Sequence, residues 1–252
     1  HGEVLASQRV VEAVEGEFDL RRGPPVPSRG KAESLPSWAV RRRFSGLRRR
    51  GQGTWVPRAR ELTVVQDALR GLQEGRGSLL VFEGDPGSGK SRLLAELRTL
   101  ARRRGLPFHG VHLPALTTTR PDEMLRDLLA SLLAEEPDAP TRQLLEAVDR
   151  LSELALPEHH LKALRQLLGA PMRSRRNRDA GWRALSATLR RIARSTPLVV
   201  ALDDAHYMAP ATLPRFRQWL DHLQELPILI LVAHRPPVPH ELGDGAVRIP
   251  FP

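Results

Sequence analysis

One segment of the chain combines a glycine spacing and side chains that could bind phosphate. Gly84-Asp85-Pro86-Gly87-Ser88-Gly89-Lys90-Ser91 fits the pattern G-x-x-x-x-G-K-[ST]. Glycines let the backbone turn tightly, so that successive N–H groups can surround phosphate oxygens at the positive end of a following helix. Lys90 would then supply a positive charge for the β- and γ-phosphates, and Ser91 would supply a hydroxyl ligand for Mg²⁺.

The residues on both sides of this loop predict the strand and the helix that it needs. Residues 79–83 are an apolar run typical of a buried strand, and residues 92–102 have the spacing of an amphipathic helix. The alternative is a glycine-rich loop that matches by chance, which the strand–loop–helix order disfavours. We therefore expect ATP and Mg²⁺ as ligands, although the sequence does not distinguish ATP from GTP.

Two carboxylates follow a second apolar run. Asp203 and Asp204 come directly after residues 198–202, and the carboxyl ends of parallel strands form the ligand crevice of an α/β sheet. We predict that Asp203 holds Mg²⁺, and that Asp204 orients or deprotonates an attacking water. In the alternative interpretation, either residue only caps the segment that follows.

Two further residues at strand ends are candidates. Arg235 follows the apolar run 228–232 and could reach the γ-phosphate across the crevice, or it could be a surface charge before a proline turn. His206 could report the nucleotide state through a hydrogen bond, although a lone histidine near a strand end is more often structural. We predict Asp204 and Arg235 as the catalytic pair.

The order of apolar runs predicts the elements that position these residues. Strands that are apolar throughout and that alternate with helices favour a parallel sheet covered on both faces. The predicted fold is an α/β P-loop NTPase with a helical insertion, preceded by a small αβ tail. Strands are expected at 79–83, 107–113, 198–202, 228–232 and 247–251, and helices at about 61–75, 92–102, 181–195 and 211–223, with a helical region at 120–169.

The first part of the chain has a different composition. Ser7 can cap a short helix that carries Val10, Val11 and Val14, and strands are expected at 18–20 and 35–40. We divide the chain into a first domain at 1–43, a basic linker at 44–60 and the ATPase domain at 61–252. Because the chain starts with His1 and stops soon after its last strand, we expect it to be a piece of a longer protein.

The net charge of +10 raises the question of nucleic acid. Much of the excess lies in three arginine runs, at 41–43, 48–50 and 173–178, which lack apolar periodicity and interleaved aromatic residues. Such runs are usually solvated linkers, so we do not expect this segment to bind nucleic acid. The absence of cysteine and of a long apolar run predicts a cytoplasmic chain without membrane contact.

Residues 54–252 resemble a known group of proteins. The segment 198–212, with sequence LVVALDDAHYMAPAT, is similar to the strand, acidic pair and His-aromatic signature of AAA-type ATPases in the STAND group of signalling NTPases. Residues 55–62 resemble the entry motif of that group, with Pro57 in place of its glycine and Ala59 in place of its first glutamate. The resemblance implies that Lys90 and Ser91 contact phosphate and magnesium, that Asp203 coordinates magnesium and that Arg235 is a sensor.

The first forty residues resemble a second family. Residues 2–10, Phe18 and residues 28–33 are similar to the end of class III adenylate/guanylate cyclase domains, with Arg29 in place of the first lysine of a phosphate-holding turn. The family's metal-binding carboxylates normally lie upstream, so this resemblance implies no cyclase activity for the chain itself.

The two resemblances together predict a regulatory, slow ATPase that switches with its nucleotide and contacts neighbouring domains of the same protein. Self-association stays open. The alternatives are a DNA-binding or DNA-loading AAA-type ATPase, a transcriptional regulator with a STAND module, and an interaction domain with a degenerate pocket.

Overall fold

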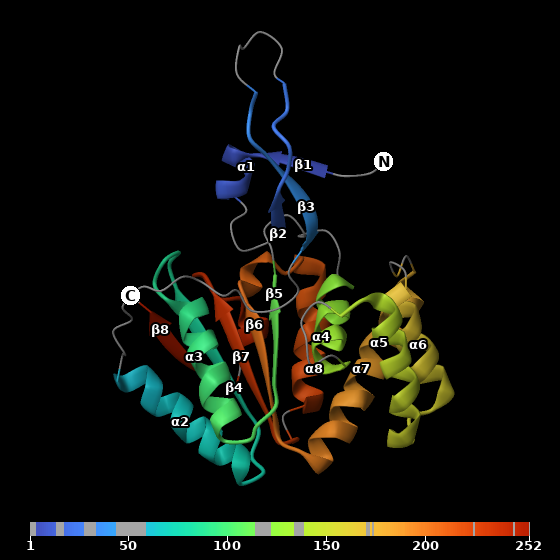
Figure 1. The fold of residues 1–252 in the computed structure, drawn as a ribbon. Helices are drawn as coiled ribbons and strands as arrows, with labels where there is room; N and C mark the ends of the chain where they lie inside the picture. The colour runs from blue at the N-terminus through green and yellow to red at the C-terminus, as the bar shows by residue number, and fades with distance from the viewer. Residues whose placement is uncertain are drawn as a thin grey trace.

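A five-stranded parallel sheet forms the centre of the larger part of the protein. The computed structural model describes residues 4–13, 18–27, 34–43, 59–113, 122–133, 139–169, 172, 174–223, 225–243 and 245–251. All neighbouring strands of this sheet are parallel, in the order β5-β6-β7-β4-β8, so their carboxyl ends share one edge (Figure 1). The strands are β4 (Ser78–Gly84), β5 (Phe108–His112), β6 (Leu198–Asp203), β7 (Ile228–His234) and β8 (Val247–Phe251).

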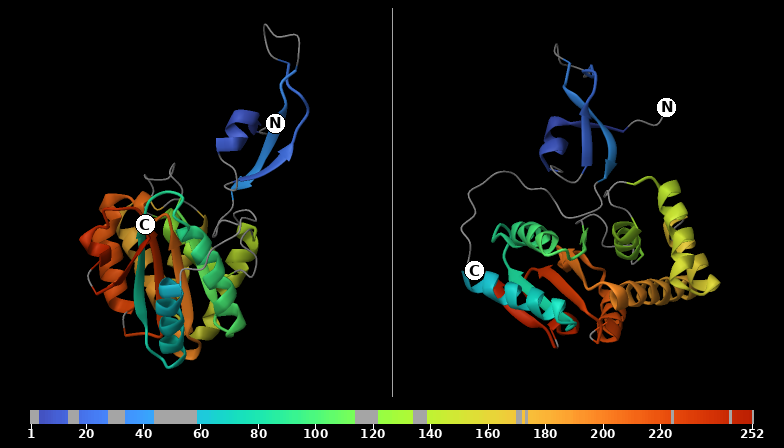
Figure 2. Two further views of the ribbon diagram at one scale, coloured as in Figure 1. Left: turned by 90° about the vertical axis from the view of Figure 1, so that its left-hand side faces the viewer. Right: turned by 60° about the horizontal axis from the view of Figure 1, so that its bottom comes forward.

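Two layers of helices cover the faces of this sheet. Alternate residues of β4 point to opposite faces, so Leu80 and Phe82 pack against one layer while Leu79 and Val81 pack against the other. The predicted α/β class, with a parallel sheet covered on both sides, is confirmed (Figures 1 and 2). The first layer is α2 (Ala59–Gln73) and α3 (Lys90–Arg103), and the second is α4 (Glu123–Leu133), α5 (Thr141–Arg150), α6 (Glu158–Gly169), α7 (Arg175–Ser195) and α8 (Leu213–Leu223).

Short elements connect the larger ones. The 3₁₀ turn η2 (Leu151–Leu154) joins α5 to the segment before α6, and η3 (Ala205–Tyr207) and η4 (Pro210–Thr212) lead from β6 to α8. The short helix α9 (His240–Gly243) precedes β8. Among the described residues, no helix combines the length and the apolar character needed to cross a bilayer.

The N-terminal residues form a small antiparallel sheet with the order β1-β3-β2. Its elements are β1 (Val4–Ser7), α1 (Gln8–Ala13), β2 (Phe18–Arg22) and β3 (Ser37–Arg43). The sequence prediction missed β1, and it extended the third strand to Leu35, which instead makes an isolated bridge with Val26. Val14, the segment 28–33 and residues 2–3 lie outside the described residues.

The arginine runs are not all linkers, which corrects the prediction. Arg41 to Arg43 form the end of β3, where pairing with β2 satisfies the backbone without any apolar pattern. Residues 175–178 form the first turn of α7, which begins six residues before the predicted start at Gly181. Ser174 explains that start, because its side chain accepts a hydrogen bond of 3.1 Å from the N–H of Asn177 and so caps the helix.

Only residues 59 and 60 of the predicted linker lie within the described part of the chain. Helix α2 begins at Ala59, so the last two residues of the predicted 44–60 linker are helical. The run 48–50, Arg173 and the segment 55–58 of the entry motif lie outside the described residues.

Candidate functional site

The phosphate-loop motif lies where the sequence predicts it, between the end of β4 and the start of α3. Gly87 and Gly89 adopt positive φ angles of 85° and 100°, which side chains disfavour. Gly84 is required for a different reason, because a Cβ atom there would lie 2.3 Å from the carbonyl oxygen of Phe251 in β8. The loop geometry thus depends on glycine at three positions.

Lys90 is held inside this loop. Its side chain is buried, and Nζ donates hydrogen bonds to the carbonyl oxygens of Gly84 at 2.7 Å and Asp85 at 2.8 Å, and to Ser88 Oγ at 3.2 Å. Burial lowers the pKa of Lys90, and the nearby carboxylate of Asp204 partly offsets this effect. A buried ammonium whose hydrogen-bond partners are all neutral is well placed to exchange them for an anionic acceptor.

The loop and the end of β6 are joined directly. Ser91 Oγ donates a hydrogen bond of 2.9 Å to Asp203 Oδ1, although the two residues are 112 positions apart in the sequence. Asp203 is fully buried, and its Oδ1 also accepts the N–H of Asp204 at 3.0 Å. Its Oδ2 is buried and accepts no hydrogen bond within the described part of the chain. A hydroxyl and a buried carboxylate with spare acceptor capacity match the oxygen ligands that Mg²⁺ prefers.

Asp204 lies beside Asp203 in an unusual backbone conformation. Its φ of 55° is in the left-handed region, which turns the chain sharply at the end of β6. Its Oδ2 lies 3.6 Å from His112 Nδ1, and its Oδ1 lies 3.9 Å from His206 Nδ1. The predicted acidic pair is therefore present at the carboxyl edge, with a histidine near each oxygen of Asp204.

The sequence analysis missed His112. This residue ends β5, pairs in register with Asp203 and is buried, with Nδ1 3.7 Å from Asp203 Oδ2. Ligand atoms of His112, Asp203 and Asp204 all lie within 4.8 Å of one another. The available signal was its position near the end of the strand predicted at 107–113, at the same edge as the acidic pair.

Arg235 follows β7 and faces the same edge. Its guanidinium carbon lies 5.6 Å from the centre of the Tyr207 ring, which is a cation–π contact. Its charge also contributes to lowering the pKa of Lys90 and that of His206, so all three belong to one electrostatic environment.

His206 is electrically neutral in this environment. Burial lowers the pKa of His206 to about 4, and the charges of Arg235, His234 and Lys90 act in the same direction. Its ring packs on Tyr207 at a centroid distance of 4.0 Å, which fits the structural role. A neutral imidazole can also donate one hydrogen bond and accept another, so the reporting role stays open.

Comparisons with known proteins extend these observations. An uncharacterized protein of Rhizobium meliloti (strain 1021) is 29% identical over 222 residues, and the match covers 81% of this chain and 20% of that protein. The chain thus spans about a fifth of the length of this curated relative.

Two solved structures were found to be similar. The crystal structure of Cdc6p from Pyrobaculum aerophilum has a TM-score of 0.46 and 17% identity, covering 82% of this chain and 50% of that one. The Aeropyrum pernix Orc1 protein, solved in complex with DNA, has a TM-score of 0.45 and 16% identity, covering 80% of this chain and 46% of that one.

A family model covers most of the described site. The model of the AAA ATPase domain matches residues 54–232, a range that includes the phosphate loop, His112 and the acidic pair. Arg235 and β8 follow this range, and the N-terminal sheet precedes it. The chain belongs to the AAA ATPase domain family.

Proposed function

We propose that the chain is an ATP- and Mg²⁺-binding regulatory ATPase module of the STAND type, which acts as a nucleotide-dependent switch. The observation that carries the proposal is the hydrogen bond from Ser91 to Asp203. It brings a phosphate loop and a buried carboxylate to one edge of a parallel sheet, which is where α/β sheets bind ligands. Had the two lain at different edges, the proposal would have had no site.

The residues of the site divide into phosphate and metal ligands. The loop 84–91 offers backbone N–H groups and Lys90 Nζ to phosphate oxygens, and Ser91 and Asp203 offer oxygen ligands to a divalent cation. The cation, when bound, neutralises phosphate charge. His112 approaches the same carboxylates and adds one nitrogen ligand atom to the set.

Asp204 and Arg235 are the candidates for the hydrolytic step. The carboxylate of Asp204 lies 3.6 Å from His112 Nδ1 and 3.9 Å from His206 Nδ1. Deprotonation or orientation of a water by Asp204 suits slow hydrolysis, and Arg235 would stabilise charge on the γ-phosphate. We propose that the ATP- and ADP-bound forms differ in their contacts with neighbouring domains of a longer, cytoplasmic protein.

The N-terminal sheet is proposed to be a separate domain, covering 1–43, that comes from a cyclase-like protein. The support is the sequence pattern of residues 2–10, Phe18 and 28–33, together with the combination of α1 with strands β1 to β3. Limited proteolysis within 44–58 should separate the two parts and leave nucleotide binding with the larger one. Assaying the whole parent protein for cyclic-nucleotide formation tests the resemblance itself.

A DNA-binding ATPase is the second candidate, because the net charge is +10. It predicts that affinity for duplex DNA falls steeply with salt as counterions are released. A flat salt response would exclude it.

The principal test measures binding of a non-hydrolysable ATP analogue, with and without Mg²⁺, to the wild type, Lys90→Ala and Lys162→Ala. Lys162 is an exposed lysine on α6, so its replacement makes the same chemical change away from the loop. We expect Lys90→Ala to weaken binding at least about tenfold, because charge-assisted hydrogen bonds to phosphate are lost. Equal affinity in all three proteins would defeat the proposal.

The switch is tested separately from binding. Protease cleavage patterns of the wild type with the ATP analogue and with ADP should differ at the carboxyl edge of the sheet, near η3 and Arg235. Identical patterns at saturating nucleotide would leave a binding module without a switch.

A further inference from the structure

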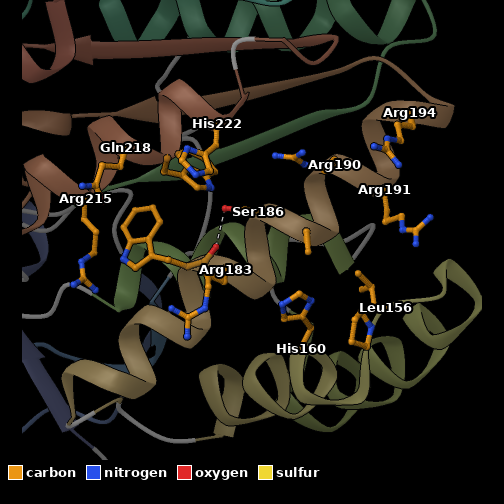
Figure 3. Close-up of a pocket in the computed structure, with 14 residues that line it drawn as sticks. Leu156, His160, Arg183, Ser186, Arg190, Arg191, Arg194, Arg215, Gln218 and His222 are labelled. Atoms are coloured by element: carbon orange, nitrogen blue, oxygen red, sulfur yellow. Dashed lines mark hydrogen bonds between the residues drawn. The ribbon is translucent and has the colours of Figure 1, made fainter.

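A groove lined with arginine side chains lies on the helical layer that contains α7 and α8. It has a volume of about 580 Å³ and lies between α7, α8 and the segment that joins η2 to α6 (Figure 3). We call it the arginine groove. Its rim consists of Arg183, Arg190, Arg191, Arg194 and Arg215, and its floor includes Leu156, Trp182, Ala187 and Trp219.

The cations of the rim form a row. Arg183, Arg190 and Arg194 recur at helical spacing along one side of α7, and Figure 3 shows Arg215 and His222 entering from α8. Arg183 and Arg194 are eleven positions apart, which corresponds to about 16 Å along a helix. A row of that length matches an extended or helical segment better than a single compact anion.

Most of these cations have no acidic partner. Arg215 forms an ion pair with Asp179, and Arg191 donates a weak hydrogen bond of 3.5 Å to the carbonyl oxygen of Ala155. Within the part of the chain that the structure describes, no carboxylate pairs with Arg183, Arg190 or Arg194. Because like charges repel, this arrangement gains stability when an anionic partner binds.

The floor is apolar and fixed. Trp182 and Trp219 are buried, and their ring centroids lie 5.7 Å apart in a T-shaped contact that also includes Phe216. Trp219 Nε1 is a buried donor without a hydrogen-bond partner in the described part of the chain. The groove therefore offers apolar contact area beneath its row of cations.

The positive surface continues toward the start of α7. A second hollow of about 350 Å³ shares Trp182, Arg215 and Gln218 with the arginine groove and adds Arg175 and Arg178. The two hollows together extend along most of α7, which further favours an elongated ligand.

We propose that the arginine groove docks an acidic amphipathic peptide segment of a partner protein or domain. Its carboxylates would pair with the arginines of α7, and its apolar side chains would cover Leu156, Ala187 and the tryptophan edges. The positive charge of the groove favours an acidic ligand, and its apolar floor favours a ligand that also carries hydrophobic side chains.

Nucleic acid is a poorer match for this surface. Phosphate groups would use the arginines but not the apolar floor, and base stacking needs exposed aromatic faces. Trp182 and Trp219 are instead 6% and 3% exposed.

Helix α7, which lines the groove, is connected to the nucleotide site by β6. Helix α7 ends at Ser195 and leads within three residues into β6, which ends at Asp203. Docking is nevertheless proposed to occur with or without nucleotide, so it does not depend on the function proposed above.

The test measures binding of a fluorescent fourteen-residue peptide, with glutamates on one helical face and leucines on the other, to the complete 252-residue chain. Two further probes, a polyglutamate peptide and a single-stranded oligonucleotide, are chosen to have the same net charge as the amphipathic peptide. The protein variants are Arg190→Glu/Arg194→Glu and the matched control Arg102→Glu/Arg103→Glu. The control places the same charge change on exposed arginines of the last turn of α3.

We expect the groove variant to bind the amphipathic peptide at least tenfold more weakly than the wild type, and the control variant to bind it within threefold. Polyglutamate should bind more weakly than the amphipathic peptide, because it lacks apolar contacts. Arg190→Lys/Arg194→Lys, which keeps the charge, should retain most of the affinity.

Three results would overturn the proposal. The first is that the wild type does not bind the amphipathic peptide, and the second is that the groove and control variants lose equal affinity for it. The third is that the wild type prefers the oligonucleotide and that this preference depends on Arg190 and Arg194. The midpoint of urea denaturation reports the folding of each variant. Peptide binding by Lys90→Ala separates failure of the groove from failure of the nucleotide site.

Discussion

The phosphate loop and the arginine groove both carry positive charge. In the loop that charge is buried and hydrogen-bonded, whereas in the groove it is exposed and has few acidic partners. In the loop, one buried lysine makes three hydrogen bonds to neighbouring atoms, and the charges of Asp204, Asp203 and Asp85 act on it. In the groove, several exposed arginines stand along α7 with few acidic partners. A buried charge must be paired because desolvation is costly, whereas exposed arginines can remain solvated until a ligand arrives.

Because of this difference, the two regions should not tolerate substitutions equally. The conformation of the loop depends at once on glycine φ angles, close backbone contacts and several hydrogen bonds. Single substitutions there should therefore affect folding as well as binding. The groove is a surface feature of helices whose stability comes from their buried faces. Its arginines should therefore be replaceable without unfolding the protein.

The largest expected effect is on stability and comes from Gly84→Ala. A Cβ atom at this position would lie 2.3 Å from the carbonyl oxygen and 2.6 Å from the Cβ atom of Phe251, so β8 would have to move. Overpacking of this kind costs about 2–3 kcal/mol of unfolding free energy. Urea denaturation of the wild type and the variant measures the loss.

Gly71→Ala is the matched control for this prediction. Gly71 is also buried, but a Cβ atom there would contact only the guanidinium of Arg76, at an ordinary 3.5 Å. Since it lies inside α2, the change should stabilise the protein by about 0.5–1 kcal/mol through helix propensity. Equal losses of unfolding free energy in the two variants would mean that the close contact between β4 and β8 does not restrict position 84 to glycine.

The next effect is on ligand binding and comes from Asp203→Asn. The amide keeps an oxygen for Ser91 Oγ and for the N–H of Asp204, but it removes the negative charge. The gain in ATP-analogue affinity on adding Mg²⁺ should fall about tenfold or more, because interactions with charged groups contribute about 1.5–3 kcal/mol. Titration calorimetry with and without Mg²⁺ measures this gain.

Asp221→Asn provides the comparison for that variant. Asp221 is an exposed carboxylate on α8 that pairs with Arg217 at 3.0 Å. Its loss should leave the Mg²⁺ dependence unchanged. If Asp203→Asn kept the full gain with Mg²⁺, the assignment of the metal ligand would be wrong.

The same contrast explains what the sequence could predict. The loop 84–91 is contiguous, so its pattern carries the strand, the turn and the helix together, and the apolar run before Asp203 places the acidic pair at a strand end. The arginine groove has no such pattern, because Leu156, the α7 arginines and Arg215 meet only after the helices pack. His112 was missed because its role depends on the register between β5 and β6.

Helix α7 shows why its predicted start was wrong. Its first turn, 175–178, lacks apolar residues, so the periodicity that indicated the rest of the helix was absent there. The start is instead determined by the side chain of Ser174, a capping interaction that adjacent arginines obscured. Solvated arginine runs and arginine-rich helix ends thus look alike until the capping residue is considered.

A smaller effect concerns the pH dependence of stability and arises at His160, which lines the arginine groove. Burial lowers the pKa of His160, and the charges of His159 and Arg183 lower it further. In the unfolded chain the imidazole takes up a proton near pH 6.5, while in the folded protein it does so only at lower pH. The unfolding free energy should therefore fall as the pH drops below about 6.5, and it should do so less in His160→Gln.

Arg183→Gln checks the cause of that shift. Removing this charge should raise the pKa of His160 toward its ordinary value and reduce the loss of stability in acid. Denaturation midpoints at pH 7.5 and pH 5.5 for the three proteins measure the difference. If all three lost stability in parallel, other histidines would account for the acid sensitivity.

The smallest effect is expected when the groove loses its charge, in Arg190→Ala/Arg194→Ala. Neither arginine has a carboxylate partner in the described part of the chain, and both are exposed on α7, so the unfolding free energy should change by no more than about 0.5 kcal/mol. The same double variant should nevertheless lose most of its affinity for the acidic amphipathic peptide. A stability loss above about 1.5 kcal/mol would instead mean that these arginines support the packing of α7 on α8 through their aliphatic portions. Their main role would then be helix packing rather than ligand binding, and the contrast between the loop and the groove would disappear.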